Sequence, residues 1–442
     1  MNKNNSYLMF LTLVATLGGL LFGYDTAVIS GTVKYLDLNF VAPLGLSETA
    51  ASSLLGFAVS SALIGCVLGG MVGGIVASAL GRKRGLMIAA VLFIISAVGS
   101  AYPELGFPHG APHTFLTQFI IYRIIGGVGV GLASMLSPMY IAEMAPAESR
   151  GKWQNLVAAV GFSAVPVIGV MCRAIIPLAE EAWRFIFYFG GVGLIAFFVG
   201  LRYLKESPRW LVARGRLEEA EQVVFEITGK HVDLSEAAKN VQTKVPVMEV
   251  LTGMFRRQYI KRTLVLLAIV VFTNPATFTV TNWTATLLKA HGFSLEDSLM
   301  ATTIISVGVP AGLFFSSFVT DLGGRKIPIM CMLIILAVLG PIFGNMTGYW
   351  PVVLTGVVLT AVVMAMGFTV FSYTAESYPT RMRNTATGFH SSTGRLAVAA
   401  AQPLIPMAYA AYSFDGVFWI FSFLCFVPAV VIAIWGQRTG GK

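Results

Sequence analysis

LLFGYDTAVIS, residues 20–30, places one carboxylate, that of Asp25, inside a run of otherwise mostly apolar residues. The run extends over about residues 7–31, which is long enough to cross ~30 Å of hydrocarbon as a helix. A charge in hydrocarbon is costly, so such a residue is expected to have a partner and a function. The stretch therefore predicts a membrane-spanning helix and raises the question of what compensates its charge.

The composition extends this prediction to the whole chain. Of 442 residues, 56% are hydrophobic and only 12% are charged, a profile that fits a polytopic membrane protein and excludes a soluble enzyme. Continuous apolar runs predict helices rather than barrel strands. The predicted spans are 7–31, 51–77, 85–101, 117–142, 154–177, 183–204, 261–288, 298–320, 326–345, 350–373, 385–411 and 416–436. We predict an all-α membrane protein with twelve transmembrane helices.

The distribution of basic residues predicts the orientation of the chain. The net charge is +9, and the Lys and Arg clusters fall in alternate loops. By the positive-inside rule these loops and both termini are cytoplasmic. The first apolar stretch carries no cleavage site, so we expect a retained helix in a cell inner membrane. The expected partners are the lipid bilayer and a small polar solute; we expect a monomer that binds no nucleic acid.

The chain divides into two halves with repeated charge clusters. We predict a six-helix bundle at 1–204, a cytoplasmic, partly helical linker at 205–260 and a second six-helix bundle at 261–442. GRKRG at 81–85 corresponds to DLGGRK at 321–326, and AEMAPAESRGK at 142–152 corresponds to AESYPTRMRN at 375–384. Such internal pseudo-symmetry is typical of a transporter whose bundles rock about a central site. Within the linker, Gly215–Lys230 has the periodicity of an amphipathic helix.

Two groups of motifs resemble known transporters. LVATLGGLLFGYDTAVISGTV and IYRIIGGVGVGLASMLSPMYIAEMAPA, within residues 10–152, resemble proton symporters of the sugar porter branch of the major facilitator superfamily. After residue 152, WRFIFYFGGVGLI and ESYPTRMRNTATGF resemble facilitators for organic acids and other metabolites. The resemblance implies the major facilitator fold, with two pseudo-symmetric bundles, and proton-coupled transport. It also raises the possibility of a natural or engineered chimera.

Asp25 and Arg123 are the first candidate functional pair. Each lies about six residues from the outer end of its predicted helix, so at 1.5 Å per residue they lie at similar depth and can pair. A carboxylate whose Arg partner leaves while burial remains favours its protonated form. The resemblance implies that the two residues are the proton-coupling pair of the symporters. A static structural ion pair is the alternative.

The substrate residues of the sugar porters are mostly replaced. FTNPATFTVTNWTATLL, residues 272–288, stands where that family carries paired glutamines, and Gly394 and Arg395 replace a Gln-Trp pair. Arg395 lies near the predicted midplane, where a guanidinium suits a carboxylate or is bonded to helix carbonyls as a structural group. The further candidates for substrate binding, each also explicable as helix-helix contacts, are Phe22, Asn274, Asn282, Trp283, Tyr373 and Gln402.

The charge clusters predict a cytoplasmic gate. The pairs expected are Glu143 with Arg150, Glu206 with Arg209, Asp321 with Arg325, and Glu376 with Arg381 or Arg383, and the gate also includes Arg82 and Arg84. A network made in one orientation and broken in the other biases the rocking equilibrium. The first loop has Ser78 and Ala79 where the superfamily commonly has an Asp-Arg pair, so that loop lacks its acid.

Other readings of the sequence are weaker. The glycine stretches 69–74 and 126–131 indicate close helix packing rather than nucleotide loops. No metal-like cysteine spacing and no catalytic cluster is visible, so we expect no enzyme and no cofactor other than the proton as coupling ion. The predicted function is proton-coupled symport of a monosaccharide or sugar-derived metabolite. The alternatives are proton-coupled transport of an organic anion, such as a sugar acid or aromatic acid, and a non-transporting membrane sensor.

Overall fold

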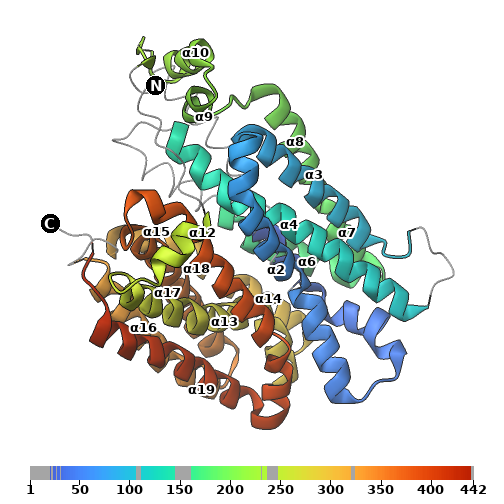
Figure 1. The fold of residues 1–442 in the computed structure, drawn as a ribbon. Helices are drawn as coiled ribbons and strands as arrows, with labels where there is room; N and C mark the ends of the chain where they lie inside the picture. Colours follow the sequence, from blue (N-terminus) through green and yellow to red (C-terminus); the bar gives the residue numbers. More distant parts are fainter. Residues whose placement is uncertain are drawn as a thin grey trace.

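The structure is a computed structural model that describes residues 20, 23–25, 27–29, 31–105, 111–144, 161–229, 231–235, 247–319 and 324–439. Over these residues the chain forms helices and connecting turns (Figure 1). Eight of the described helices are long and apolar enough to cross a membrane. For these eight helices, the prediction that long apolar runs form membrane-spanning helices is confirmed.

The helices follow one another in two groups joined by short linker helices, and α9 and α10 project from one end of the molecule, called here the linker end (Figure 1). The first half contains α2 (Glu48–Ala79), α3 (Arg82–Ala101), α4 (Pro112–Met144), α6 (Ala164–Ile175), α7 (Ala182–Tyr188) and α8 (Val192–Tyr203). The linker helices are α9 (Pro208–Ala213), α10 (Leu217–Thr228) and α12 (Val247–Met254). The second half contains α13 (Ile260–Ala290), α14 (Leu295–Ile305), α15 (Gly308–Val319), α16 (Lys326–Asn345), α17 (Tyr349–Glu376), α18 (Thr380–Ala401) and α19 (Leu404–Trp435).

Several predicted spans are interrupted. Span 183–204 is divided into α7, a 3₁₀ turn at Phe189–Gly191 and α8, and span 298–320 into α14 and α15. Spans 7–31 and 154–177 fall partly outside the described residues. Apolar periodicity does not locate such breaks, because the side chains on both sides of a break face the same hydrocarbon.

The boundary between the last two spans lies inside α19. Ser413 has a left-handed φ of 63°, which interrupts the helix. After this residue α19 runs antiparallel to α16, since Lys326 Nζ donates to the Ala433 carbonyl at 2.9 Å and Gly344 lies against the backbone of Asp415. The chain therefore reverses at Ser413, between predicted spans 385–411 and 416–436.

The predicted linker helix is present as α10. It has Glu218 and Glu219 in its first turn, where a helix dipole favours acids. It ends at Gly229, whose φ of 70° is the left-handed conformation of a helix C-cap. The expected helix at Gly215–Lys230 is thus confirmed, two residues shorter at each end.

Glycines bring α2 and α4 into backbone contact. A Cβ on Gly65 would lie 2.0 Å from the Ile124 carbonyl oxygen, and one on Gly127 would lie 2.0 Å from that of Ala62. Gly69 meets the Val128 carbonyl in the same way, at 2.2 Å. Such approach is possible only without side chains and is the usual packing of small residues in membranes. The glycine stretches are confirmed as packing surfaces.

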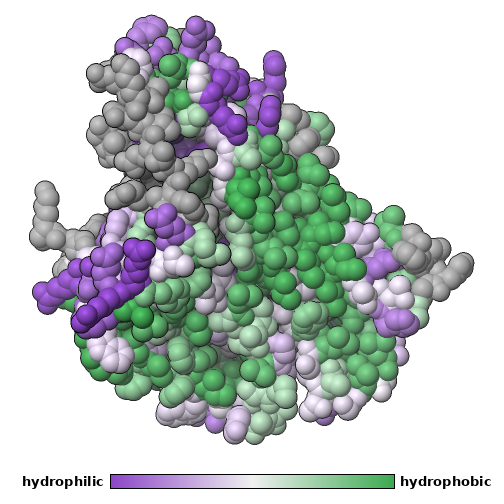
Figure 2. Space-filling view, viewed as in Figure 1, coloured by the Kyte–Doolittle hydropathy of each residue, from purple (hydrophilic) through white to green (hydrophobic). Residues whose placement is uncertain are grey.

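The surface of the bundle is apolar, as a lipid-facing surface requires. Figure 2 shows a broad hydrophobic face over the long helices, with polar residues gathered at the linker end. Large side chains such as Met71, Ile75 and Phe314 are more than 60% exposed. A soluble protein rarely exposes a contiguous surface of this kind.

A charged cluster joins α3 to α7 at the end opposite the linker. Arg184 donates to both carboxylate oxygens of Glu104 at 2.8 Å and to the Ala101 carbonyl at 2.8 Å, and its guanidinium lies over the rings of Tyr102 and Trp183. Burial is the largest single influence on the pKa of Glu104 and raises it, but the hydrogen bonds from Arg184, a backbone hydrogen bond and the charge of Arg184 together outweigh burial, so the net pKa is below its ordinary value of 4.5.

We expect Gly65→Ala to destabilise the protein by about 1–3 kcal/mol, because the new methyl group overlaps a backbone carbonyl that cannot move independently of α4. The measurement is the thermal unfolding midpoint in detergent. Gly367→Ala is the matched control, since nothing lies within 4 Å of a Cβ at Gly367. Equal midpoints for the two variants would contradict the packing argument.

We expect Glu104→Gln to lower stability at neutral pH, with Glu180→Gln, an exposed neighbour, as control. Because folded Glu104 ionises at a lower pH than in the unfolded chain, its ionised form stabilises the fold above about pH 4.5. That contribution is lost as the pH falls through the folded pKa, so the difference between wild type and Glu104→Gln should shrink below pH 4.5. A difference that is independent of pH would refute the ion-pair explanation.

Candidate functional site

Asp25 and Arg123 form a forked ion pair between the first helix and α4. Arg123 Nη1 donates to Asp25 Oδ1, and Nη2 donates to Oδ2 at 3.0 Å. The Arg123 side chain is 3% exposed and that of Asp25 is 13% exposed. The predicted pairing is confirmed; two parallel hydrogen bonds to a carboxylate are the strongest form that such a pair takes.

The first helix is held in place beside this pair. Tyr24, the neighbour of Asp25, donates its hydroxyl to the Ile186 carbonyl and lies 3.1 Å from that of Phe187, both on α7. Arg123 Nε is buried and has no hydrogen-bond partner within the described part of the chain. The guanidinium thus depends on Asp25 for much of its compensation.

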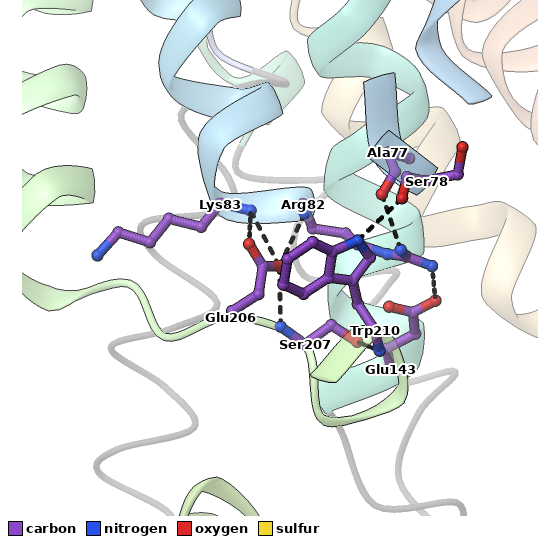
Figure 3. A network of polar contacts seen from close by, with 8 residues as sticks. All are labelled: Ala77, Ser78, Arg82, Lys83, Glu143, Glu206, Ser207 and Trp210. Carbon is purple, nitrogen blue, oxygen red and sulfur yellow. Dashed lines mark hydrogen bonds and ion pairs between the residues drawn. The ribbon is translucent and has the colours of Figure 1, made fainter. Parts of the chain in front are cut away.

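A polar cluster at the linker end joins the α2–α3 turn to α4 and α9 (Figure 3). Arg82 Nη2 donates to Glu143 Oε1 at 2.7 Å, and Arg82 Nη1 donates to the Ala77 carbonyl at 3.0 Å. Glu206 Oε1 accepts the backbone amides of Arg82 at 2.7 Å and Ser207 at 2.9 Å. Lys83 N lies 3.3 Å from both Glu206 oxygens.

The expected pairings in this cluster are corrected by the structure. Glu143 binds Arg82 rather than the expected Arg150, which lies outside the described residues. Glu206, expected to pair with Arg209, lies instead at the amino end of α3, where the helix dipole attracts an anion. The acid that the first loop lacks is therefore supplied by the start of the linker. Arg84 and Arg209 are exposed.

Two further residues of this cluster were not identified from the sequence. Trp210 Nε1 donates to the Ser78 carbonyl at 3.1 Å, at the carboxyl end of α2 (Figure 3). Gly81 has a φ of 93°, and a Cβ there would lie 2.2 Å from a Glu206 oxygen. In the sequence, Gly81 stands directly before the basic residues that begin α3. This pattern is the signal that could have indicated that an acidic side chain binds there.

The second half repeats the ion pair of the first. Arg325, at the start of α16, donates to Glu376, at the end of α17, with Nη2–Oε1 at 3.0 Å. Glu376 was expected to pair with Arg381 or Arg383, and Arg325 with Asp321, which is outside the described residues. Arg383 is exposed, and the Arg381 side chain is not among those described. The pair corresponds to Arg82–Glu143 because each joins a third-helix start to a fourth-helix end.

The predicted substrate residues of the second half separate into groups. Trp283 Nε1 donates to Gln402 Oε1, and both side chains are buried. Asn282 is buried on α13 and accepts from the Thr281 hydroxyl at 3.2 Å. The Tyr373 hydroxyl contacts the backbone of Gln437 at 3.0 and 3.1 Å, three residues from the linker end of α17, and its role in substrate binding stays a prediction. Phe22 lies outside the described residues.

A family model described as "Sugar (and other) transporter" matches residues 11–441. The chain belongs to this family. Its members are transporters rather than enzymes, in agreement with the prediction.

The curated relatives include both sugar symporters and metabolite transporters. Over 240 residues the chain is 52% identical to the D-xylose-proton symporter of Escherichia coli K12, covering 51% of this chain and 49% of the symporter. This match thus spans about half the length of that relative. The inner membrane metabolite transport protein YdjE of Escherichia coli K12 is 27% identical over 424 residues, with 93% and 90% covered.

The fold is that of a solved sugar transporter. The partially occluded inward open conformation of the xylose transporter XylE from E. coli matches with a TM-score of 0.83 and 33% identity, covering 99% of both chains. The proton:xylose symporter bound to 6-bromo-6-deoxy-D-glucose matches with a TM-score of 0.78, covering 99% of this chain and 97% of that one. The predicted major facilitator fold is confirmed.

Arg395 of this sugar transporter forms hydrogen bonds that connect the two halves. From α18 its Nη2 donates to Ser134 Oγ on α4 at 2.9 Å, and its Nη1 to the Cys66 carbonyl on α2 at 3.4 Å. Asn274 lies against the neighbouring Gly394, with its amide nitrogen 2.0 Å from where a Cβ on Gly394 would be. Both readings of Arg395 stay open: one of its contacts is to a helix carbonyl, and whether it binds a carboxylate stays a prediction.

We expect Glu206→Gln to lower stability by about 1 kcal/mol, because the variant keeps an acceptor but loses the charge at the amino end of α3. The thermal midpoint in detergent measures this. Glu180→Gln, an exposed acid in a turn outside the helices, is the control for loss of charge alone. If Glu206→Gln unfolds at the same temperature as Glu180→Gln, the assigned role of Glu206 is wrong.

Proposed function

We propose that this chain is a proton-coupled symporter that moves a monosaccharide or a sugar-derived small metabolite by alternating access. The observation that carries the proposal is the buried Asp25–Arg123 pair, in a chain whose family consists of transporters. A charge pair this deep is costly to maintain unless it is used. The naming of two relatives as a D-xylose-proton and an arabinose-proton symporter supports the same reading.

The chemistry proposed for the pair needs one titratable carboxylate and one movable cation. In the conformation described, Arg123 donates two hydrogen bonds to the Asp25 carboxylate. When rocking of the halves draws Arg123 away, burial without a countercharge favours the neutral, protonated carboxyl. Asp25 then binds a proton in one orientation and releases it in the other, which couples the proton gradient to substrate movement.

The gate clusters support alternating access. Arg82–Glu143 lies within the first half and Arg325–Glu376 within the second, so each pair braces one end of one bundle. Towards the opposite end the halves meet, where Gly56 lies against Pro403 and Arg173 pairs with Glu296 at 3.4 Å. Among the ion pairs of the described residues, Arg173–Glu296 is the one that joins the two halves, and it lies at the end opposite the linker. This arrangement suits a conformation that is open towards the linker end.

The proposed setting is a cell inner membrane, with the linker end and both termini in the cytoplasm and the chain acting as a monomer. Basic residues at the starts of α3 and α16 support this orientation by the positive-inside rule. A metabolite transporter with which the chain aligns over 93% of its length is named as an inner membrane protein. Nothing in the described residues favours a sensor over a transporter.

We expect Asp25→Asn to abolish uphill uptake in proteoliposomes while exchange of labelled for unlabelled substrate continues. The amide cannot carry a proton through the cycle, but the bundles can still rock with substrate bound. The measurement compares accumulation driven by an imposed pH gradient with equilibrium counterflow. Arg202→Gln, an exposed charge at the end of α8, is the control. Proton-driven accumulation by Asp25→Asn would disprove the assignment.

A further inference from the structure

Arg395 lies where a substrate between the halves would meet it. It is the fifteenth residue after the start of α18, which puts its backbone about 22 Å from the linker end of that helix. Its partners Ser134 and Cys66 belong to two helices of the other half. In transporters built from repeated bundles, substrates bind near the midplane at the interface between the repeats.

The fold makes room for the guanidinium at this interface. A Cβ on Gly70 of α2 would lie 3.6 Å from Arg395 Nη1 and 3.5 Å from Ser392 Oγ, so α2 passes the cation with no side chain between. On the second half, Asn274 occupies the space beside Gly394. The Arg395 guanidinium therefore extends from the second half to contact α2 and α4 of the first half.

Two hydrogen bonds of the fork can be exchanged for bonds to a ligand. Ser134 Oγ and the Cys66 carbonyl are neutral acceptors, and the carbonyl contact is long at 3.4 Å. Ser134 also donates to the Gly131 carbonyl, so it keeps a hydrogen bond if Arg395 leaves. A carboxylate binds both nitrogens of an Arg fork more strongly than neutral oxygens do.

We propose that Arg395 binds the carboxylate of an anionic substrate, and that the transported solute is a sugar acid with one carboxylate rather than a neutral sugar. The proposal rests on the proposed symport and names its substrate class. With one proton carried on Asp25 and one negative charge on the substrate, the cycle moves no net charge. A neutral sugar carried with one proton would move one positive charge.

The test uses the full chain in proteoliposomes, with D-xylose, D-xylonate and D-glucuronate as labelled solutes and a pH indicator dye inside. We expect wild type to take up at least one acid with a lower half-saturating concentration than D-xylose. Arg395→Gln should raise that concentration for the acid about tenfold or more and change that for D-xylose less than twofold. Arg395→Lys, which keeps the charge without the fork, should fall between, and Arg202→Gln should match wild type.

A second measurement needs no variant. A negative-inside potential set with potassium and valinomycin should accelerate uptake of D-xylose but not of the monovalent acid, because only the former cycle moves charge. Uptake of D-xylose and of neither acid would overturn the proposal. So would an Arg395→Gln variant whose half-saturating concentration changes equally for all three solutes, and Arg395 would then be a structural contact between the halves. If no solute moves protons in wild type, the proposed symport itself fails.

Discussion

A charge that enters hydrocarbon must have a partner there, and the Asp25–Arg123 pair is the interaction on which the first half is organised. The desolvation cost of either group alone is several kcal/mol, and the fork of two hydrogen bonds offsets it only when both side chains meet in one geometry. To bring both side chains into that geometry, the first helix and α4 must be held at a fixed distance and orientation relative to each other. The Tyr24 contact with α7 restrains the first helix from one side.

Helix packing supplies the remaining restraint, since lipid provides no hydrophobic force that drives helices together. The glycines that α2 and α4 share hold the two backbones in contact, so Arg123 on α4 has a fixed position relative to α2. The same contact places Cys66 and Ser134 side by side, and these are the residues that Arg395 reaches from the other half. One packed helix pair therefore positions both Arg123 and two acceptors of Arg395.

Sequence reasoning succeeded where a single physical rule was sufficient. Apolar length located the long spans, equal depth paired Asp25 with Arg123, and small residues indicated close packing. It failed where a side chain binds backbone at a place set by tertiary structure: Glu206, expected to pair with Arg209, caps α3 from over a hundred residues away. It also did not predict that Glu143 binds Arg82 or that Glu376 binds Arg325, because these pairs join residues that are far apart in the sequence and are brought together by the fold.

The two halves thus share the ion pair at the linker end but differ within the membrane. Arg82–Glu143 and Arg325–Glu376 are equivalent by pseudo-symmetry, whereas α17, the counterpart of α4, contains no charged residue before Glu376. The buried pair of Asp25 and Arg123 therefore belongs to the first half, and Arg395 is a cation of the second. Because Arg395 bonds to α2 and α4, any rocking that separates the halves at this level must break these contacts, and a ligand that replaces them lowers the cost of that separation. Under the proposed symport, the proton on Asp25 and a substrate at Arg395 would both act on the packed pair of α2 and α4, which is the condition for coupling them.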